Sequence, residues 1–133
     1  MPKEVILDNE YASLWYDSDL HAVRHRLKKT VPVELLRDLL ARGCELMEMK
    51  GARKWLSDDR ENKVVSQEIA DWSLGSLRPF MLKSGWKFWA VVPPTSPLNR
   101  ARMQCFVELY AKLGITTCIF SDLDEAVKWL AEQ

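Results

Sequence analysis

Two adjacent carboxylates, Asp58 and Asp59, are the residues whose type and position best suggest chemistry. They follow the short apolar run 54–56, which we expect to be a strand. Such a pair could act as general acid and base if burial or mutual repulsion raised one pKa. Neighbouring residues of a strand point to opposite faces, however, so the two are not expected to share a proton. We therefore predict no catalytic residue here, and expect the pair to cap the next helix or to bind Arg53 or Arg60.

Two histidines, His21 and His25, have the four-residue spacing that places zinc ligands on one side of a helix. The sequence around them alternates like a strand. In a strand they would share a face but lie about 13 Å apart, at about 3.3 Å per residue. We therefore predict no metal site and no cofactor.

A second candidate contact site combines Ser96 and Arg100 at the predicted start of a helix. A hydroxyl, helix N–H groups and a guanidinium group could together hold an anion. No glycine-rich loop accompanies them, so nucleotide binding is not expected, and helix capping is the favoured role of Ser96.

The elements that position these residues are predicted from hydrophobic periodicity. Residues 3–29 contain three strand-like runs, of which the last two should form an antiparallel hairpin with Val23, His25 and Leu27 on one face. The period then changes to that of a helix from Pro32 to Lys50, ended by Gly51.

The rest of the chain alternates strands and helices. Ser66 is predicted to cap a helix that runs to Gly85, with a kink or break between Gly75 and Pro79, because a proline cannot donate to the carbonyl four residues back. Further strands are expected at 54–56, 87–92 and 115–120, and further helices after the N-caps Ser96 and Asp122. The expected buried positions are Ile69, Trp72, Leu77, Phe80 and Met81 in the second helix, and Ala101, Cys105, Val107, Leu109 and Leu113 in the third.

These elements predict one α/β domain over residues 1–133. It should contain a mixed sheet of five to six strands, antiparallel at the start and parallel afterwards, with four helices. The loop from Asp58 to Ser66 would then lie at the carboxyl end of a parallel strand, where open α/β sheets bind ligands and partners.

Composition excludes several classes of protein. Nineteen basic residues balance nineteen acidic ones, so no net field attracts nucleic acid. No apolar stretch reaches the roughly 18 residues of a membrane span, and the N-terminus does not resemble a secretory signal. Cys44, Cys105 and Cys118 lack ligand spacing and lie in apolar sequence, which predicts buried free thiols and a cytoplasmic location.

Five segments carry a family resemblance: Leu14-Trp15-Tyr16, Asp58-Asp59-Arg60, Ile69-Ala70-Asp71-Trp72, the Gly85 turn and the ending 119–130. Together they resemble the STAS-like superfamily, the anti-sigma-factor antagonists, and especially its bacterial SpoIIAA-like (STAS/SEC14-like) branch. In that superfamily a serine at a helix N-terminus is phosphorylated by a partner kinase, and the resemblance places Ser66 at that position. The acidic neighbour and glycine of the usual motif are missing around Ser66, which favours a plain N-cap.

The favoured hypothesis is a non-enzymatic regulatory or protein-interaction module that contacts a protein partner through Asp58, Asp59, Arg60 and Ser66. The SEC14-like label suggests an alternative, a carrier or sensor of a small apolar ligand held in a cavity. An enzyme using Asp58 and Asp59 is a third hypothesis. The early strands could also pair between two copies of the chain to form a homodimer, because an open sheet edge invites pairing.

Overall fold

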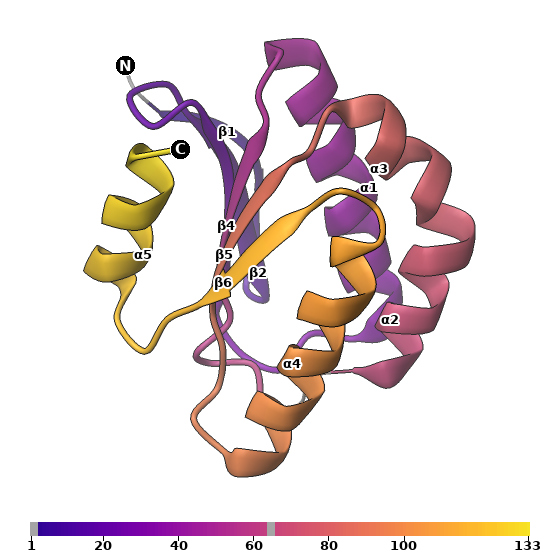
Figure 1. The fold of residues 1–133 in the computed structure, drawn as a ribbon. Coiled ribbons are helices and arrows are strands. Elements are labelled where there is room, and N and C mark those ends of the chain that lie inside the picture. The colour runs from indigo at the N-terminus through magenta and orange to yellow at the C-terminus, as the bar shows by residue number, and fades with distance from the viewer. Residues whose placement is uncertain (1–2, 64–65) are drawn as a thin grey trace.

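The computed structural model describes residues 3–63 and 66–133, which form one six-stranded sheet with helices on both faces (Figure 1). The strand order follows the sequence from β1 to β6. The strands are β1 Lys3–Asp8, β2 Ala12–Asp17, β3 Ala22–Leu27, β4 Lys54–Asp58, β5 Phe88–Val92 and β6 Thr116–Ile119. β1, β2 and β3 are antiparallel neighbours, and β3 to β6 are parallel. The predicted mixed α/β sheet is therefore confirmed.

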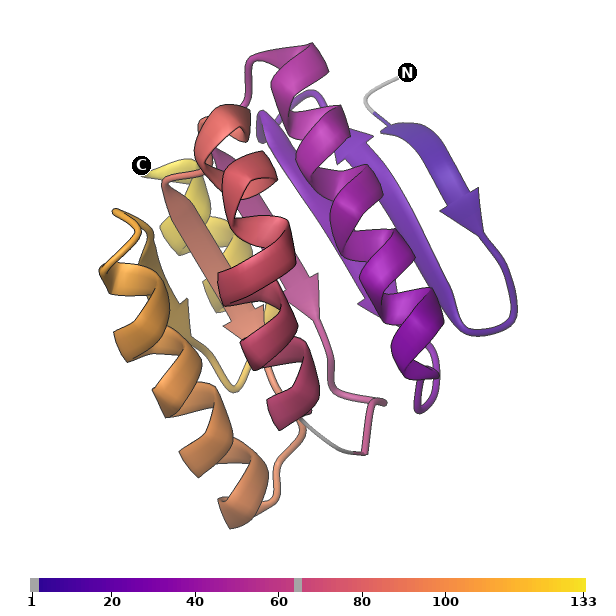
Figure 2. The ribbon, with the colours of Figure 1, turned by 90° about the vertical axis from the view of Figure 1, so that its right-hand side faces the viewer.

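Three helical segments lie side by side on one face of the sheet, and a fourth covers the other face (Figure 2). The first face carries α1 Val33–Lys50, the continuous helix made of α2 Gln67–Trp72, η1 Ser73–Leu77 and α3 Arg78–Ser84, and α4 Pro97–Ala111. The other face carries α5 Leu123–Ala131. Within the described chain no helix is long and apolar enough to cross a membrane.

Local capping signals fix the helix ends as predicted. Ser66 and Ser96 accept hydrogen bonds from the backbone N–H groups three residues on, and Asp122 accepts one from Asp124. α1 ends at Gly51, whose φ of 62° is a left-handed conformation that glycine adopts without steric cost.

The second helix is irregular where Pro79 predicted a kink or break. Pro79 has no N–H to donate to the carbonyl of Gly75, and the five-residue η1 segment, which contains Gly75 and ends at Leu77, is a wider, π-helical turn. The expected burial of Phe80 is wrong. Its side chain is 61% exposed, whereas its neighbour Met81 is buried, because the helix turns Met81 toward α1 and the sheet.

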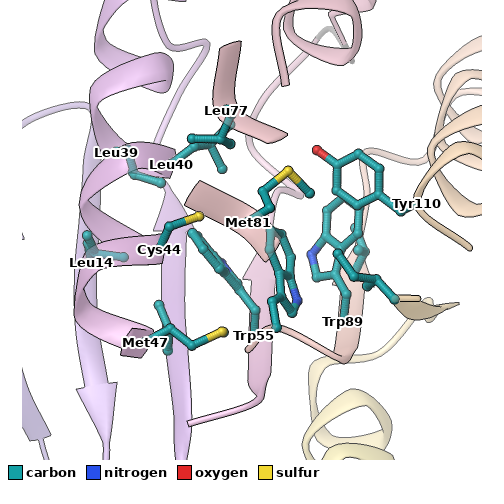
Figure 3. Packing of buried hydrophobic residues seen from close by; sticks show 14 of the residues in the cluster. Leu14, Leu39, Leu40, Cys44, Met47, Trp55, Leu77, Met81, Trp89 and Tyr110 are labelled. Carbon is teal, nitrogen blue, oxygen red and sulfur yellow. The ribbon is translucent and has the colours of Figure 1, made fainter. Parts of the chain in front are cut away.

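An aromatic cluster fills the core between the sheet and the first three helical segments (Figure 3). Trp55 stacks on Trp86 with ring centroids 4.6 Å apart, and Trp89 stacks on Tyr110 at 5.0 Å. Each of these indole N–H groups has an acceptor, as burial of a tryptophan requires: His25, Phe88 and Ser57 accept from Trp55, Trp86 and Trp89 respectively.

The buried face of α4 was predicted only in part. Met103, Phe106 and Tyr110 point into the aromatic cluster, and the expected Leu109 and Leu113 pack against it, whereas Ala101 and Cys105 are exposed. The prediction of buried thiols is confirmed for Cys44 and wrong for the other two. Cys105 is exposed because it lies on the outer side of α4, and Cys118, in β6, is partly exposed.

Candidate functional site

A small cavity opens at the carboxyl ends of β3 and β4, between the sheet and helices α1, α2 and α4. Its volume is about 50 Å³. Most of its lining is apolar or aromatic, and a few polar side chains gather at one part. The lining residues are His25, Leu27, Leu36, Leu40, Ser57, Asp59, Asn62, Ser66, Ile69, Trp86, Trp89, Met103, Phe106 and Tyr110. Three residues of the loop singled out from the sequence therefore reach the interior.

The central polar contact of this cavity joins Asp59 to His25. Oδ1 of Asp59 lies 2.7 Å from Nε2 of His25. The His25 side chain is 3% exposed and that of Asp59 is 18% exposed. A buried imidazole thus contacts a carboxylate that remains partly exposed to solvent.

The second nitrogen of His25 fixes the tautomer of the ring. Nε1 of Trp55 lies 3.0 Å from Nδ1 of His25. An indole N–H can only donate, so Nδ1 must offer its lone pair. The proton of the imidazole therefore sits on Nε2, from which it is donated to Asp59, and the ring is neutral in this arrangement.

Strand register brings these residues together. β3 and β4 are parallel, and His25 is the register partner of Ser57. Trp55, Ser57 and Asp59 follow each other at two-residue spacing. Trp55 and Ser57 therefore point, with His25, to the face covered by α1, α2 and α4. Asp59 continues this face just beyond the end of β4. His25 and Asp59 are thereby placed in contact although 34 residues separate them.

Ser57 completes the polar part of the site without forming a nucleophile-base pair. Its Oγ accepts a hydrogen bond from Nε1 of Trp89 at 2.8 Å. A serine nucleophile needs a free imidazole nitrogen as base, and both nitrogens of His25 are engaged, by Asp59 and by Trp55. The arrangement is a hydrogen-bonded chain from Asp59 into the core.

Asp58 lies on the opposite face of the sheet, as the two-residue period of a strand predicts. Arg60 donates two hydrogen bonds of 2.8 Å to its carboxylate, from Nε and from Nη2. Burial opposes ionisation of Asp58, but these bonds and the charge of Arg60 outweigh it and hold the pKa of the carboxyl below its usual 3.8. The predicted pairing of this loop with Arg60 is confirmed for Asp58, while the partner of Asp59 is His25.

Ser66 and Asn62 belong to the same lining. Oγ of Ser66 accepts the N–H of Ile69 at 3.2 Å, so its hydroxyl caps α2. Nδ2 of Asn99 donates to the backbone oxygen of Lys63 at 2.8 Å and ties the loop to α4. Val64 and Val65, which belong to the loop identified from the sequence, lie outside the described residues.

The other candidate residues lie away from this cavity. Oγ of Ser96 caps α4, and Arg100 donates to Oγ of Ser121 at 2.6 Å, so the suggested anion contact stays a prediction. His21 occupies a turn with φ 55° and lies 3.2 Å from the hydroxyl of Tyr16. Across residues 3–63 and 66–133 no group of three or more potential ligands is placed to hold a metal ion.

Comparison with known proteins adds no assignment: no family model, no curated protein and no solved structure matches this chain.

The sequence reasoning located Asp59 and Ser66 but missed the pairing of Asp59 with His25. The available signal was that His25 shares the face of Val23 and Leu27, and that Asp59 shares the face of Trp55. Had the two strands been paired in register, His25 would have fallen beside Ser57, and Asp59 would have followed as the next residue on the same face.

Proposed function

We propose that this protein is a non-enzymatic regulatory or protein-interaction module of STAS-like fold, which binds a partner protein through the loop from Asp59 to Ser66 and the start of α2. The observation that supports this is the cavity itself. It opens beside that loop, and its lining joins polar loop residues to apolar core residues. A partner side chain inserted there would be buried among rigid aromatic groups, as interface anchors are.

The size of the cavity favours a side-chain tip as its occupant. A volume of about 50 Å³ is enough for a few water molecules. It is well below the roughly 150 Å³ of a cavity that encloses benzene. A lipid-like ligand would need the core side chains to move, so the carrier alternative is the weaker of the two.

The placement of the two carboxylates also favours binding over catalysis. Asp58 is paired with Arg60 on one face of the sheet, and Asp59 is paired with His25 on the other. They do not form the shared acid and base site that an enzyme using both would need.

The test is capture of partners from lysate of the source cell by tagged protein, quantified by mass spectrometry. We compare the wild type with Asp59→Asn and Ser66→Ala, and use Asp19→Asn as the matched control, because Asp19 is an exposed acid in the turn between β2 and β3, outside the proposed contact loop. The proposal expects a set of proteins that is captured by the wild type and the control and lost with both variants.

Recovery of the same proteins with all four forms would contradict the proposal. The carrier alternative has its own readout, which is the native mass of the protein purified under mild conditions. A bound mass that is retained in the wild type and removed by organic extraction would favour the carrier.

A further inference from the structure

Among the described residues, no cation balances the charge of Asp59. Its single ion-pair contact within the described chain is with His25, and the Trp55 N–H requires that ring to be neutral. Among the residues that the structure describes, Oδ2 of Asp59 has no hydrogen-bond partner, and Oδ1 is used by His25. The site therefore holds a net negative charge with acceptor capacity to spare.

That charge is partly withdrawn from water. The Asp59 side chain is 18% exposed and shares its cavity with Leu36, Ile69, Met103 and other apolar groups. Partial desolvation of a carboxylate is costly unless a cation or hydrogen-bond donors compensate it. The same low polarity strengthens its attraction for any cation that enters.

The other walls of the cavity also suit a cation on an apolar stem. Trp86, Trp89, Phe106 and Tyr110 contribute aromatic rings, against which the methylene groups of such a stem can pack. Oγ of Ser57 is fully buried and lines the cavity, and it has a second lone pair besides the one that Trp89 uses. Hydrogen-bond acceptors thus lie at one part of the cavity, and aromatic and aliphatic side chains line the rest.

The volume narrows the class of cation. About 50 Å³ is several times the 10–15 Å³ that one water needs. It suits a compact ammonium with its nearest methylenes better than the wider, planar guanidinium of arginine. An ammonium can donate three hydrogen bonds, enough for Asp59 Oδ2 and Ser57 Oγ together.

We infer that the cavity between Asp59, Ser57 and the aromatic cluster recognises a primary ammonium group, and that its occupant is the tip of a lysine side chain of the partner protein. This rests on the proposed function, because it names the residue by which the partner would be anchored. Charge complementarity with Asp59 and the size of the cavity carry it.

The chemistry of the cavity is tested without any partner. The whole protein is titrated with n-butylammonium chloride, n-butanol and sodium butyrate at constant ionic strength, while NMR follows the Trp55 indole N–H and the His25 ring nitrogens. Saturable shifts are expected with butylammonium, and about tenfold weaker responses or none with the neutral and anionic probes. Equal responses to butanol and butylammonium would overturn the inference. This comparison uses the wild type alone, so it does not depend on the folding of a variant.

Asp59→Asn then tests the charge. The amide oxygen can still accept from His25, so the shape of the site is kept while its charge is removed. Binding of butylammonium is expected to weaken about tenfold or more, whereas Asp19→Asn, in the exposed turn between β2 and β3, should bind like the wild type. Unchanged binding by folded Asp59→Asn would contradict the inference.

A last comparison separates the inference from the proposed function. Lysate proteins are acetylated on their lysines before capture by the unmodified tagged protein. If acetylation abolishes capture of the Asp59-dependent proteins, the inference is supported. If they are still captured, the inference is overturned, but the proposed interaction function is not. Butylammonium binding without any Asp59-dependent protein would overturn the proposed function and make a free amine the ligand.

Discussion

The indole N–H of Trp55 lies 3.0 Å from Nδ1 of His25, and this contact connects the packing of the core to the chemistry of the cavity. Trp55 is fully buried, and its ring plane is nearly perpendicular to that of His25, at 81°. Because the indole only donates, it selects the imidazole tautomer that donates to Asp59. The uncharged Trp55 thus determines that the Asp59 carboxylate receives a hydrogen bond from His25.

Replacing Trp55 by phenylalanine should disturb His25 as well as stability. The change removes the donor to Nδ1 and leaves a buried acceptor unpaired, which costs at least about 1–3 kcal/mol in the free energy of unfolding. Denaturant titration measures this loss, and nitrogen NMR of the His25 ring reports the freed Nδ1. Trp86→Phe is the control, since the Trp86 indole donates to the backbone oxygen of Phe88. If both variants shifted the His25 nitrogens alike, the tautomer argument would be wrong.

Gly43 in α1 should tolerate no side chain, because the ring of Trp55 occupies the place of a Cβ atom. A methyl group there would overlap several ring carbons of Trp55, and the ring is held by His25 and by Trp86. Gly43→Ala is expected to destabilise the protein by about 1–3 kcal/mol, despite the better helix propensity of alanine.

The matched control is Gly75→Ala, because nothing lies within 4 Å of the corresponding Cβ position. That change should be neutral or stabilise the protein by up to about 1 kcal/mol. Thermal or denaturant unfolding of the two variants provides the comparison. Equal stability of Gly43→Ala and the wild type would show that Trp55 can move, and with it the support of His25.

Much of the fold could be predicted because its signals are local. Gly51, Ser66, Ser96 and Asp122 mark helix ends through the backbone groups next to them in sequence. The buried face of α4 could not be predicted in the same way. Apolar residues occur nearly all round that helix, so its periodicity does not distinguish the side of Cys105 from that of Met103 and Phe106.

The candidate site could be predicted in part for a similar reason. The two-residue period of a strand placed Asp58 and Asp59 on opposite faces, and it placed His25 on the same face of β3 as Val23 and Leu27. The contact of His25 with Asp59 also requires the register of two parallel strands joined by α1. Parallel register depends on how the crossover helix packs, and no short sequence motif encodes it.

The three cysteines should differ strongly in reactivity, in line with their different burial. Cys105 is exposed on α4 and should react with iodoacetamide first in the native protein. Burial raises the pKa of Cys118, and it raises that of Cys44 to about 12, so Cys44 should react only after unfolding. Peptide mapping by mass spectrometry after timed labelling, with a denatured sample as reference, gives the three rates. Labelling of Cys44 as fast as Cys105 in native protein would contradict the packing of α1.

The Asp58 and Arg60 pair should make stability depend on acid pH in a defined direction. The folded-state pKa of Asp58 lies below its ordinary value of 3.8, because Arg60 outweighs the effect of burial. A depressed carboxyl pKa contributes stability that is fully present above the unfolded-state pKa, near 3.9, and that is lost as pH falls through the lower folded-state pKa. The free energy of unfolding should therefore decrease as the pH is lowered below about 4.

The variant Asp58→Asn tests this pair. It should be less stable than the wild type at pH 7, and the difference in stability should shrink below pH 4. The control Asp19→Asn, at an exposed turn, should follow the wild type at both pH values. Urea titrations at pH 7 and pH 3 measure this, and a constant difference between wild type and Asp58→Asn would show that Arg60 does not stabilise the ionised carboxylate.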